Sequence, residues 1–299
     1  MTSGRAAGSD AEYPSVAISH GDYAAEIALF GGAVRALTYR GAPLVESYEG
    51  KPPLMAGVVL APWPNRTEDG RFEWQGTVHQ LDITEPERNN AIHGFAVDWW
   101  RMKERTENRV VLTFDIEPRH GWPWAIQLEV TYCLDEHGLY HQLTARTAEP
   151  GEVPFAYGLH LYLSPQGAGV GEAVLSVDVA KRHLLDGRNL PTGQTEPVRI
   201  IKQPIDEVDW DDCFHGEGPL TAIYTAGGKG VRLEMGEGLN WVQMFTPADF
   251  PRADGPGKAL AVEPMSAPPN ALRSGGDLVR LSAQNPQTFT LRLAAENTK

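Results

Sequence analysis

The stretch AIQLEVTYCLDEHGLYHQLTART (residues 125–147) alternates apolar and polar side chains on both sides of a short polar segment. A period of two residues is typical of a β-strand with one buried face. Asp135 to Gly138 provides the residue types that form tight turns. The stretch therefore predicts an antiparallel hairpin of two long strands.

The same alternation recurs along the chain, and Gly31-Gly32, Gln75-Gly76 and Gly227-Gly228 mark further hairpin turns. No window of a dozen residues free of Gly and Pro shows a helical period. With 31 Gly and 23 Pro, turn signals recur at the spacing typical of a large antiparallel sandwich or barrel. We predict one all-β domain over residues 14–299, preceded by a loose N-terminal tail over residues 1–13.

Composition narrows the class of protein. A hydrophobic content of 41% with eight Trp residues supports a sizeable core. The net charge of -13 disfavours a nucleic-acid partner. The N-terminus has no apolar stretch, and the longest apolar run, residues 54–63, is too short to cross a bilayer. We therefore expect a cytoplasmic protein with neither a membrane nor a nucleic-acid partner, as a monomer or a homodimer.

Several motifs of known chemistry do not occur in the sequence. It contains no phosphate-binding P-loop, no G-x-S-x-G elbow and no H-E-x-x-H zinc motif. His137 and His141 are four residues apart but straddle the predicted turn, so they do not share a face. We predict no metal site and no cofactor.

Five stretches place polar side chains where a β-protein ordinarily has apolar or simple turn residues. They are APWPNRTEDGRF (61–72), NNAIHGFAVDWW (89–100), AYGLHLYLS (156–164), EVDWDDCF (207–214) and ALAVEPMSAPPNAL (259–272). Each has an ordinary explanation when taken alone. A His in an apolar strand is usually a hydrogen-bonded core residue, and an Arg commonly forms a surface ion pair.

Together, and in this order, the five stretches resemble the aldose 1-epimerase (galactose mutarotase) family. The hairpin GRFEWQGTVHQL (70–81) and the late strand WVQMFTP (241–247) add to the resemblance, which runs from about residue 15 to about residue 293. It implies a large antiparallel β-sandwich with a sugar cleft on one face. It also implies an isomerase that interconverts the α and β anomers of a free aldose without a cofactor.

The resemblance also implies roles for particular residues. Glu263 would be the catalytic base and His160 the general acid, and we expect them on opposite sides of one small cavity. The sugar ligands would be Arg66, His93 and Asp211, with Asn65 and Gln243 as further candidates.

Asp211 is preferred to Asp212 because the acid of the family pattern stands three residues before an aromatic residue, here Phe214. The pKa of Glu263 would rise through burial beside Met265 and Phe245, or fall beside Arg66, and the sequence does not decide between these effects.

Two alternatives concern the ligand. Arg71, Arg88 and Arg101 lie near the motifs, so a hexose 6-phosphate or a sulfonated sugar is an alternative substrate. A non-catalytic sugar-binding protein on the same scaffold is the other alternative. Three aromatic residues near the motifs favour a sugar with a flat apolar face: Trp63, Trp99 and Trp210.

Overall fold

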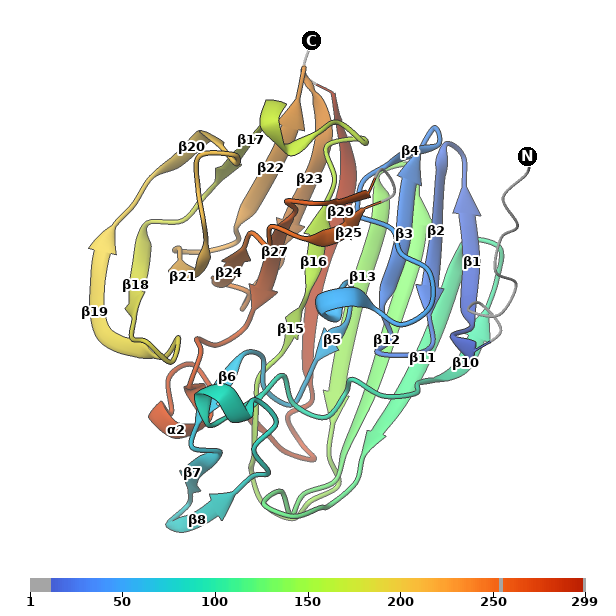
Figure 1. The fold of residues 1–299 in the computed structure, drawn as a ribbon. Coiled ribbons are helices and arrows are strands. Elements are labelled where there is room, and N and C mark those ends of the chain that lie inside the picture. Colours follow the sequence, from blue (N-terminus) through green and yellow to red (C-terminus); the bar gives the residue numbers. More distant parts are fainter. Residues whose placement is uncertain (1–11, 253–254, 298–299) are drawn as a thin grey trace.

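The computed structural model describes residues 12–252 and 255–297 (Figure 1). Within these residues no helix is long and apolar enough to cross a membrane. Residues 1–11 of the predicted tail lie outside the described residues. Tyr13, which was also assigned to the tail, stacks on Trp99 with 5.5 Å between ring centroids.

The largest sheet has nine antiparallel strands and contains the hairpin predicted from residues 125–147. In spatial order the strands are β10 (Arg101–Arg105), β11 (Arg109–Ile116), β12 (Ile126–Asp135), β13 (Gly138–Arg146), β29 (Gln287–Asn297), β23 (Lys229–Met235), β22 (Thr221–Ala226), β17 (Ala173–Val177) and β20 (Ile200–Pro204). Residues 135 and 138 face each other at the tip of β12 and β13, so the predicted hairpin is confirmed.

A second antiparallel sheet of eight strands carries the polar motifs. Its path is β19 (Pro191–Pro197), β18 (Lys181–Leu185), β21 (Asp211–His215), β24 (Trp241–Phe245), β27 (Leu260–Met265), β15 (Gly158–Leu159) and β5 (Val59–Leu60), and β16 (Leu161–Leu163) also pairs with β27. Leu143 and Leu293 of the nine-stranded sheet belong to one buried cluster with Val242 and Val262 of this sheet. The core therefore lies between the two sheets, and the predicted all-β antiparallel sandwich is confirmed.

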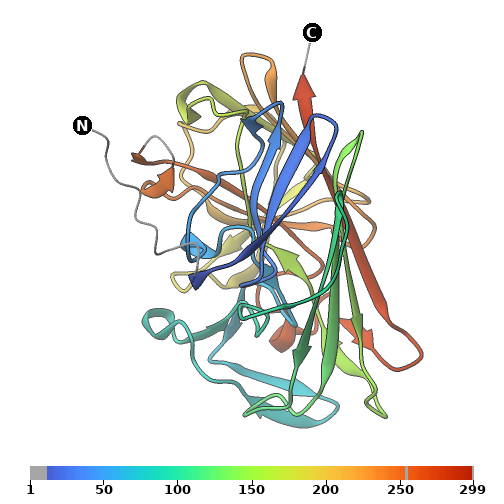
Figure 2. The same ribbon diagram turned by 90° about the vertical axis from the view of Figure 1, so that its right-hand side faces the viewer.

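The remaining elements are a four-stranded sheet that packs against β12 of the nine-stranded sheet and a set of short strand pairs and helical turns. The four-stranded sheet consists of β1 (Ser15–His20), β2 (Tyr23–Ala28), β3 (Val34–Tyr39) and β4 (Ala42–Pro43). The two-stranded pairs are β6 (Arg66–Glu68) with β9 (Asn90–Ile92), β7 (Arg71–Trp74) with β8 (Thr77–Gln80), β14 (Val153–Phe155) with β28 (Val279–Leu281) and β25 (Phe250–Arg252) with β26 (Gly255–Gly257). The helical elements are α2 (Ala271–Ser274) and the 3-10 turns η1 (Pro53–Met55), η2 (Pro86–Arg88) and η3 (Val170–Glu172). The blue β1–β3 strands stand in front of the sandwich in Figure 2.

The hairpins predicted at Gly31-Gly32, Gln75-Gly76 and Gly227-Gly228 join β2 to β3, β7 to β8 and β22 to β23. The paired tryptophans separate as the two faces of an extended chain require. Trp100 is buried, whereas Trp99 is 45% exposed.

Two local features direct side chains toward one end of the eight-stranded sheet. The strand formed by β15 and β16 is interrupted at His160, whose backbone bonds Val58 and Gly57 instead of β27. On the neighbouring ribbon of β6 and β9, Asn65 and His93 both adopt positive φ, 55° and 66°. Such conformations are uncommon outside Gly and Asn, and they occur where the surrounding structure imposes them.

Gly94 follows His93 with a φ of +70°, and a Cβ there would lie 2.2 Å from the backbone oxygen of Ala61. Gly76 has a similar φ, +79°, with nothing within 4 Å of the added Cβ. We expect Gly94→Ala to lower the free energy of unfolding by about 1–3 kcal/mol more than Gly76→Ala, because only Gly94→Ala adds a backbone clash to the backbone strain. Urea denaturation of both variants measures the difference. Equal losses would contradict the proposed close contact.

Candidate active site

A cavity of about 210 Å³ lies where the eight-stranded sheet meets the β6–β9 ribbon. All seven predicted site residues line it: Asn65, Arg66, His93, His160, Asp211, Gln243 and Glu263. Arg88, Ile92 and Phe245 complete its walls. The predicted residues come from six separate stretches of sequence, and the fold brings them together.

Glu263 and His160 are close neighbours inside this cavity. His160 Nε2 lies 3.4 Å from Glu263 Oε1, and both side chains are almost fully buried, at 7% and 3% exposure. The expectation that they lie on opposite sides of the cavity is therefore wrong. β27 pairs with both β15 and β16, so His160, at the junction of these two strands, lies directly beside the strand that carries Glu263.

Several buried polar atoms of the cavity have no hydrogen-bond partner among the described residues. They are Oε2 of Glu263, Nδ1 of His160 and Oε1 of Gln243. Gln243 lies opposite Glu263 in the β24–β27 register, so the two unpaired oxygens belong to adjacent strands. Buried polar groups are normally paired, and a cluster of unpaired groups indicates a site that a polar ligand completes.

Burial sets the protonation of the acid–base pair. Loss of solvent raises the pKa of Glu263 well above its usual range, and the charge of Asp211 adds to the rise, while Arg66 opposes it. Burial also lowers the pKa of His160 to about 4. The question that the sequence left open is thus answered in favour of burial. Burial thus disfavours the charged form of each side chain, so the proton of the pair is favoured on Glu263 and the imidazole is favoured in its neutral form.

Asp211 is held by its neighbours at the cavity wall. Gln243 Nε2 donates to Asp211 Oδ1 at 2.7 Å, and the Asn189 side-chain amide donates to the other oxygen. Arg66 Nη2 lies 3.8 Å from the same carboxylate. Asp212 points to the other face of β21, where Arg182 donates to it at 3.0 Å. The strand alternation thus places Asp211, and not Asp212, in the cavity.

The positive-φ residues of the ribbon fix the other imidazole. The backbone N–H of Asn65 donates to His93 Nδ1 at 3.3 Å, and the backbone N–H of His93 donates to the Asn65 oxygen at 3.0 Å. Because Nδ1 accepts a hydrogen bond here, the hydrogen of the neutral ring belongs on Nε2. The His93 and His160 rings are 5.6 Å apart and nearly perpendicular.

Arg66 is almost fully buried and bonds the carboxylate of Glu85 through Nε at 2.9 Å and Nη2 at 3.0 Å. Sequence reasoning missed both Glu85 and Asn189. Each stands in a polar turn stretch, where Glu and Asn are common, so the sequence carries no signal that separates them from ordinary turn residues.

The expectation of an unusually aromatic cavity is wrong. Trp63 is buried against Phe95 with 4.9 Å between centroids, and Trp210 packs against Phe214 at 5.6 Å. Trp99 lies on the surface near Tyr13, and none of the three tryptophans lines the cavity.

Of the arginines considered for an anionic substrate, only Arg88 lines the cavity. Arg71 is exposed on β7, and exposed Arg101 pairs with Asp115 on the outer edge of the nine-stranded sheet.

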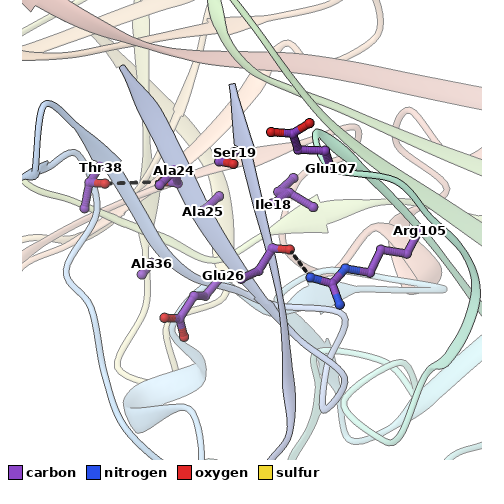
Figure 3. A pocket seen from close by; sticks show the side chains of 10 residues that line it. Ile18, Ser19, Ala24, Ala25, Glu26, Ala36, Thr38, Arg105 and Glu107 are labelled. Carbon is purple, nitrogen blue, oxygen red and sulfur yellow. Dashed lines mark hydrogen bonds between the residues drawn. The ribbon is translucent and has the colours of Figure 1, made fainter. Parts of the chain in front are cut away.

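Two larger hollows within the described residues are not lined by a buried carboxyl–imidazole pair. Figure 3 shows one of about 360 Å³ on the outward face of β1–β3, lined largely by small side chains, where Arg105 donates to the carbonyl of Ala17. A cleft of about 690 Å³ lies near Trp241, whose indole N–H donates to Asp277 at 2.8 Å. Among residues 12–252 and 255–297, no group of three or more His, Cys, Asp or Glu is arranged to hold a metal ion.

Comparison with known proteins shows the family. The model of the aldose 1-epimerase family matches residues 14–294. YihR of Escherichia coli K12, described as an uncharacterized protein, is 30% identical over 288 residues, which cover 91% of this chain and 90% of YihR.

Solved structures share the fold. A galactose mutarotase-like protein from Clostridium acetobutylicum is 19% identical, has a TM-score of 0.82 and covers 96% of each chain. The galactose 1-epimerase from Lactobacillus acidophilus is 16% identical with a TM-score of 0.79, and the match covers 96% of this chain and 95% of that chain.

The depressed pKa of His160 makes stability depend on pH. The ordinary pKa of histidine is about 6.5, so His160 of the unfolded chain binds a proton as pH falls below this value. In the folded protein His160 stays neutral until about pH 4. The stability contributed by neutral His160 is therefore complete above pH 6.5 and is lost as pH falls toward 4. Glu263, with its raised pKa, acts in the opposite sense.

We expect His160→Asn to reduce the slope of unfolding free energy against pH by about 1 kcal/mol per pH unit in this window. Chemical denaturation at a series of pH values measures the slope. His137→Asn, at an exposed position, is the matched control. An unchanged slope in His160→Asn would show that the buried imidazole is already protonated when folded.

Proposed function

Because the chain belongs to the aldose 1-epimerase family, we propose that it is a mutarotase that interconverts the α and β anomers of a free aldose. Glu263 acts as the base and His160 as the general acid. The observation that supports this most is the buried carboxyl–imidazole pair, 3.4 Å apart, with unpaired polar atoms facing one small cavity. General acid–base catalysis needs such groups within reach of the reacting atoms.

The proposed reaction begins when the proton of Glu263 passes to His160, 3.4 Å away, which leaves a carboxylate beside an imidazolium. Glu263 then takes the proton of the C1 hydroxyl while His160 gives its proton to the ring oxygen. The bond between C1 and the ring oxygen breaks, and C1 becomes an aldehyde. Rotation about C1–C2 presents the other face of the aldehyde. Reclosure returns the proton of the ring hydroxyl to His160 and the proton of Glu263 to the new C1 hydroxyl, so no net proton is gained or lost.

The arrangement of the pair suits this proton balance. Both reacting oxygens are bonded to C1, so neighbouring acid and base groups can reach them together. At the open-chain stage Glu263 is protonated and His160 is neutral. This is the state that burial favours for both groups. The cavity therefore favours the intermediate of the proposed reaction without a large reorganisation.

The other cavity residues would orient the sugar. Arg66 and the Nε2 hydrogen of His93 can donate to sugar oxygens, and Asp211 can accept from a hydroxyl. Gln243 bonds Asp211 through its amide nitrogen and leaves its oxygen unpaired, so it can accept a further hydroxyl. Asn65 contributes by holding His93 and by accepting the backbone N–H of Arg66 at 2.9 Å.

A second candidate substrate class is favoured by Arg88. Arg88 lines the cavity, its side chain is 36% exposed, and its guanidinium donates to Glu85 at 3.0 Å. A partly exposed guanidinium at the edge of a sugar cavity is a suitable partner for a phosphate or sulfonate group. The anionic sugar therefore stands as the second candidate.

Glu263→Gln tests the catalytic role. We expect it to lower the rate of anomer interconversion by about 10²–10⁴-fold, because the amide cannot accept the C1 proton. NMR exchange between freshly dissolved anomers measures the rate. Asp212→Asn, which faces away from the cavity on β21, is the control and should retain activity. Wild-type activity in Glu263→Gln would overturn the assignment, and sugar binding by a wild-type protein that does not accelerate exchange would indicate a binding protein.

A substrate panel separates neutral from anionic sugars. Glucose, galactose and their 6-phosphates are compared for wild type and Arg88→Gln. If the substrate is neutral, the 6-phosphates gain nothing and Arg88→Gln has little effect. If it is anionic, we expect kcat/KM for the phosphate ester to exceed that of the free sugar and to fall about tenfold or more in Arg88→Gln, as loss of a charged hydrogen bond predicts.

A further inference from the structure

Glu85 is a buried carboxylate that holds both arginines of the cavity. Its side chain is 8% exposed. It accepts hydrogen bonds from Arg66 Nε at 2.9 Å, Arg66 Nη2 at 3.0 Å and Arg88 Nη1 at 3.0 Å. A parallel two-point bond to a guanidinium fixes its plane as well as its position. One carboxylate outside the cavity lining thus orients two groups inside it.

Glu85 is itself held rigidly by Asn90. The backbones of the two residues exchange hydrogen bonds at 3.0 and 3.2 Å, and Asn90 Nδ2 donates to Glu85 Oε2 at 3.0 Å. Arg188 also holds this segment, because it donates to Asn90 Oδ1 at 3.1 Å and to the carbonyl of Arg88 at 2.9 Å. The segment from 85 to 90 is therefore a small closed loop built around the carboxylate.

The backbone of Arg66 is held by the β6–β9 pairing and by Asn270, whose N–H donates to the Arg66 carbonyl at 2.7 Å. These backbone bonds do not fix the far end of the side chain. β6 has three residues and pairs only with the three residues of β9. A long flexible side chain on such a short ribbon has no fixed direction unless another group holds it. None of the recorded bonds of Arg66 uses Nη1, so that nitrogen stays available to a ligand.

The carboxylate also changes the charge near the acid–base pair. The titratable or charged groups acting on Glu263 are His160 beside it, Asp211 from β21, Arg66 from β6, and Tyr162 and Cys213. Those acting on Glu85 are Arg66 and Arg88. Burial alone would raise the pKa of Glu85, but the hydrogen bonds from Arg66, Asn90 and Arg88 outweigh it and lower the pKa. Glu85 is therefore ionised and offsets the charge of Arg66.

We propose that Glu85 is a positioning residue of the active site, which aims Arg66 at the sugar and offsets its charge beside Glu263. The inference rests on the proposed function and adds a residue that touches neither the sugar nor the reacting atoms. Its two effects, direction and charge, are separable with two variants. Glu85→Asp shortens the side chain and keeps the charge, whereas Glu85→Gln removes the charge together with one of the two oxygens that accept from Arg66.

The test compares Glu85→Gln with Glu85→Asp. We expect Glu85→Gln to lower kcat/KM by on the order of tenfold to a hundredfold, as a misdirected binding group does. It should also shift the pH–rate profile to lower pH, because the uncompensated charge of Arg66 lowers the pKa of Glu263. Glu85→Asp keeps the charge but shortens the reach, so it should lose rate with little shift in the profile.

Glu68→Gln is the matched control. Glu68 is also ion-paired, with Arg188 and Arg273, and lies on β6 outside the cavity lining. Its replacement should leave the pH–rate profile in place. A profile displaced equally by Glu68→Gln would show that the shift reports general electrostatics, and the proposal would be wrong.

A double-mutant cycle tests the route of the effect. If Glu85 acts through Arg66, then Glu85→Gln causes no further loss of kcat/KM on an Arg66→Gln background. The double variant also has no unpaired buried charge, so it can be measured even if the single variant fails to fold. Full additivity, or wild-type kinetics in Glu85→Gln, would overturn the proposal. If wild type does not interconvert anomers, the proposed function fails, and a crystal structure of Glu85→Asp still decides whether the Arg66 guanidinium has moved.

Discussion

The burial of a carboxyl group beside an imidazole is the constraint on which the rest of the site depends. Water stabilises the charged form of either group, and its removal disfavours both charges. Glu263 and His160 therefore cannot be treated as an independent base and acid, because one proton belongs to the pair. The pair can release a proton to one oxygen only while it takes a proton from another. Ring opening at a carbon that carries two oxygens requires this coupling, because one oxygen must lose a proton while the other gains one.

The sandwich supplies the rigid frame that such a pair needs. Glu263 lies on a central strand between β24 and the interrupted strand β15–β16, so neighbours hold its backbone on both sides. The interruption at His160 directs its backbone bonds to residues 57 and 58, and the imidazole remains beside Glu263. Because both side chains emerge from hydrogen-bonded backbone, their separation does not depend on a flexible loop.

The ribbon of β6 and β9 works differently. It is short, and the direction of its arginine comes from side-chain contacts rather than from a sheet. Glu85 and Asn90 hold the far end of the arginine side chain with a buried hydrogen-bond network. The cavity thus combines a wall of regular sheet, which carries the acid–base pair, with a wall of loops, which carries the cationic donors. Sites on rigid scaffolds commonly show this division, because loops vary without disturbing the core.

The sequence by itself determined the class of fold and predicted a set of residues that share one cavity. Alternation with a period of two depends only on which face of a strand is buried, so residues 125–147 already predict the β12–β13 hairpin. The spaced motifs likewise identify Glu263, His160 and their five partners, and all seven line one cavity. The choice of Asp211 over Asp212 agrees with the alternation of β21.

Only the tertiary structure decided how these residues stand to one another. The adjacency of Glu263 and His160 follows from long-range strand pairing, which no local pattern encodes. Whether the pKa of Glu263 rises or falls depends on the balance between burial and the charge of Arg66. The hydrogen bonds of Glu85 and Asn189 form between turns that are distant in the sequence. Local sequence specifies the period and the turn chemistry, whereas distance, burial and charge balance depend on segments that meet only when the chain is folded.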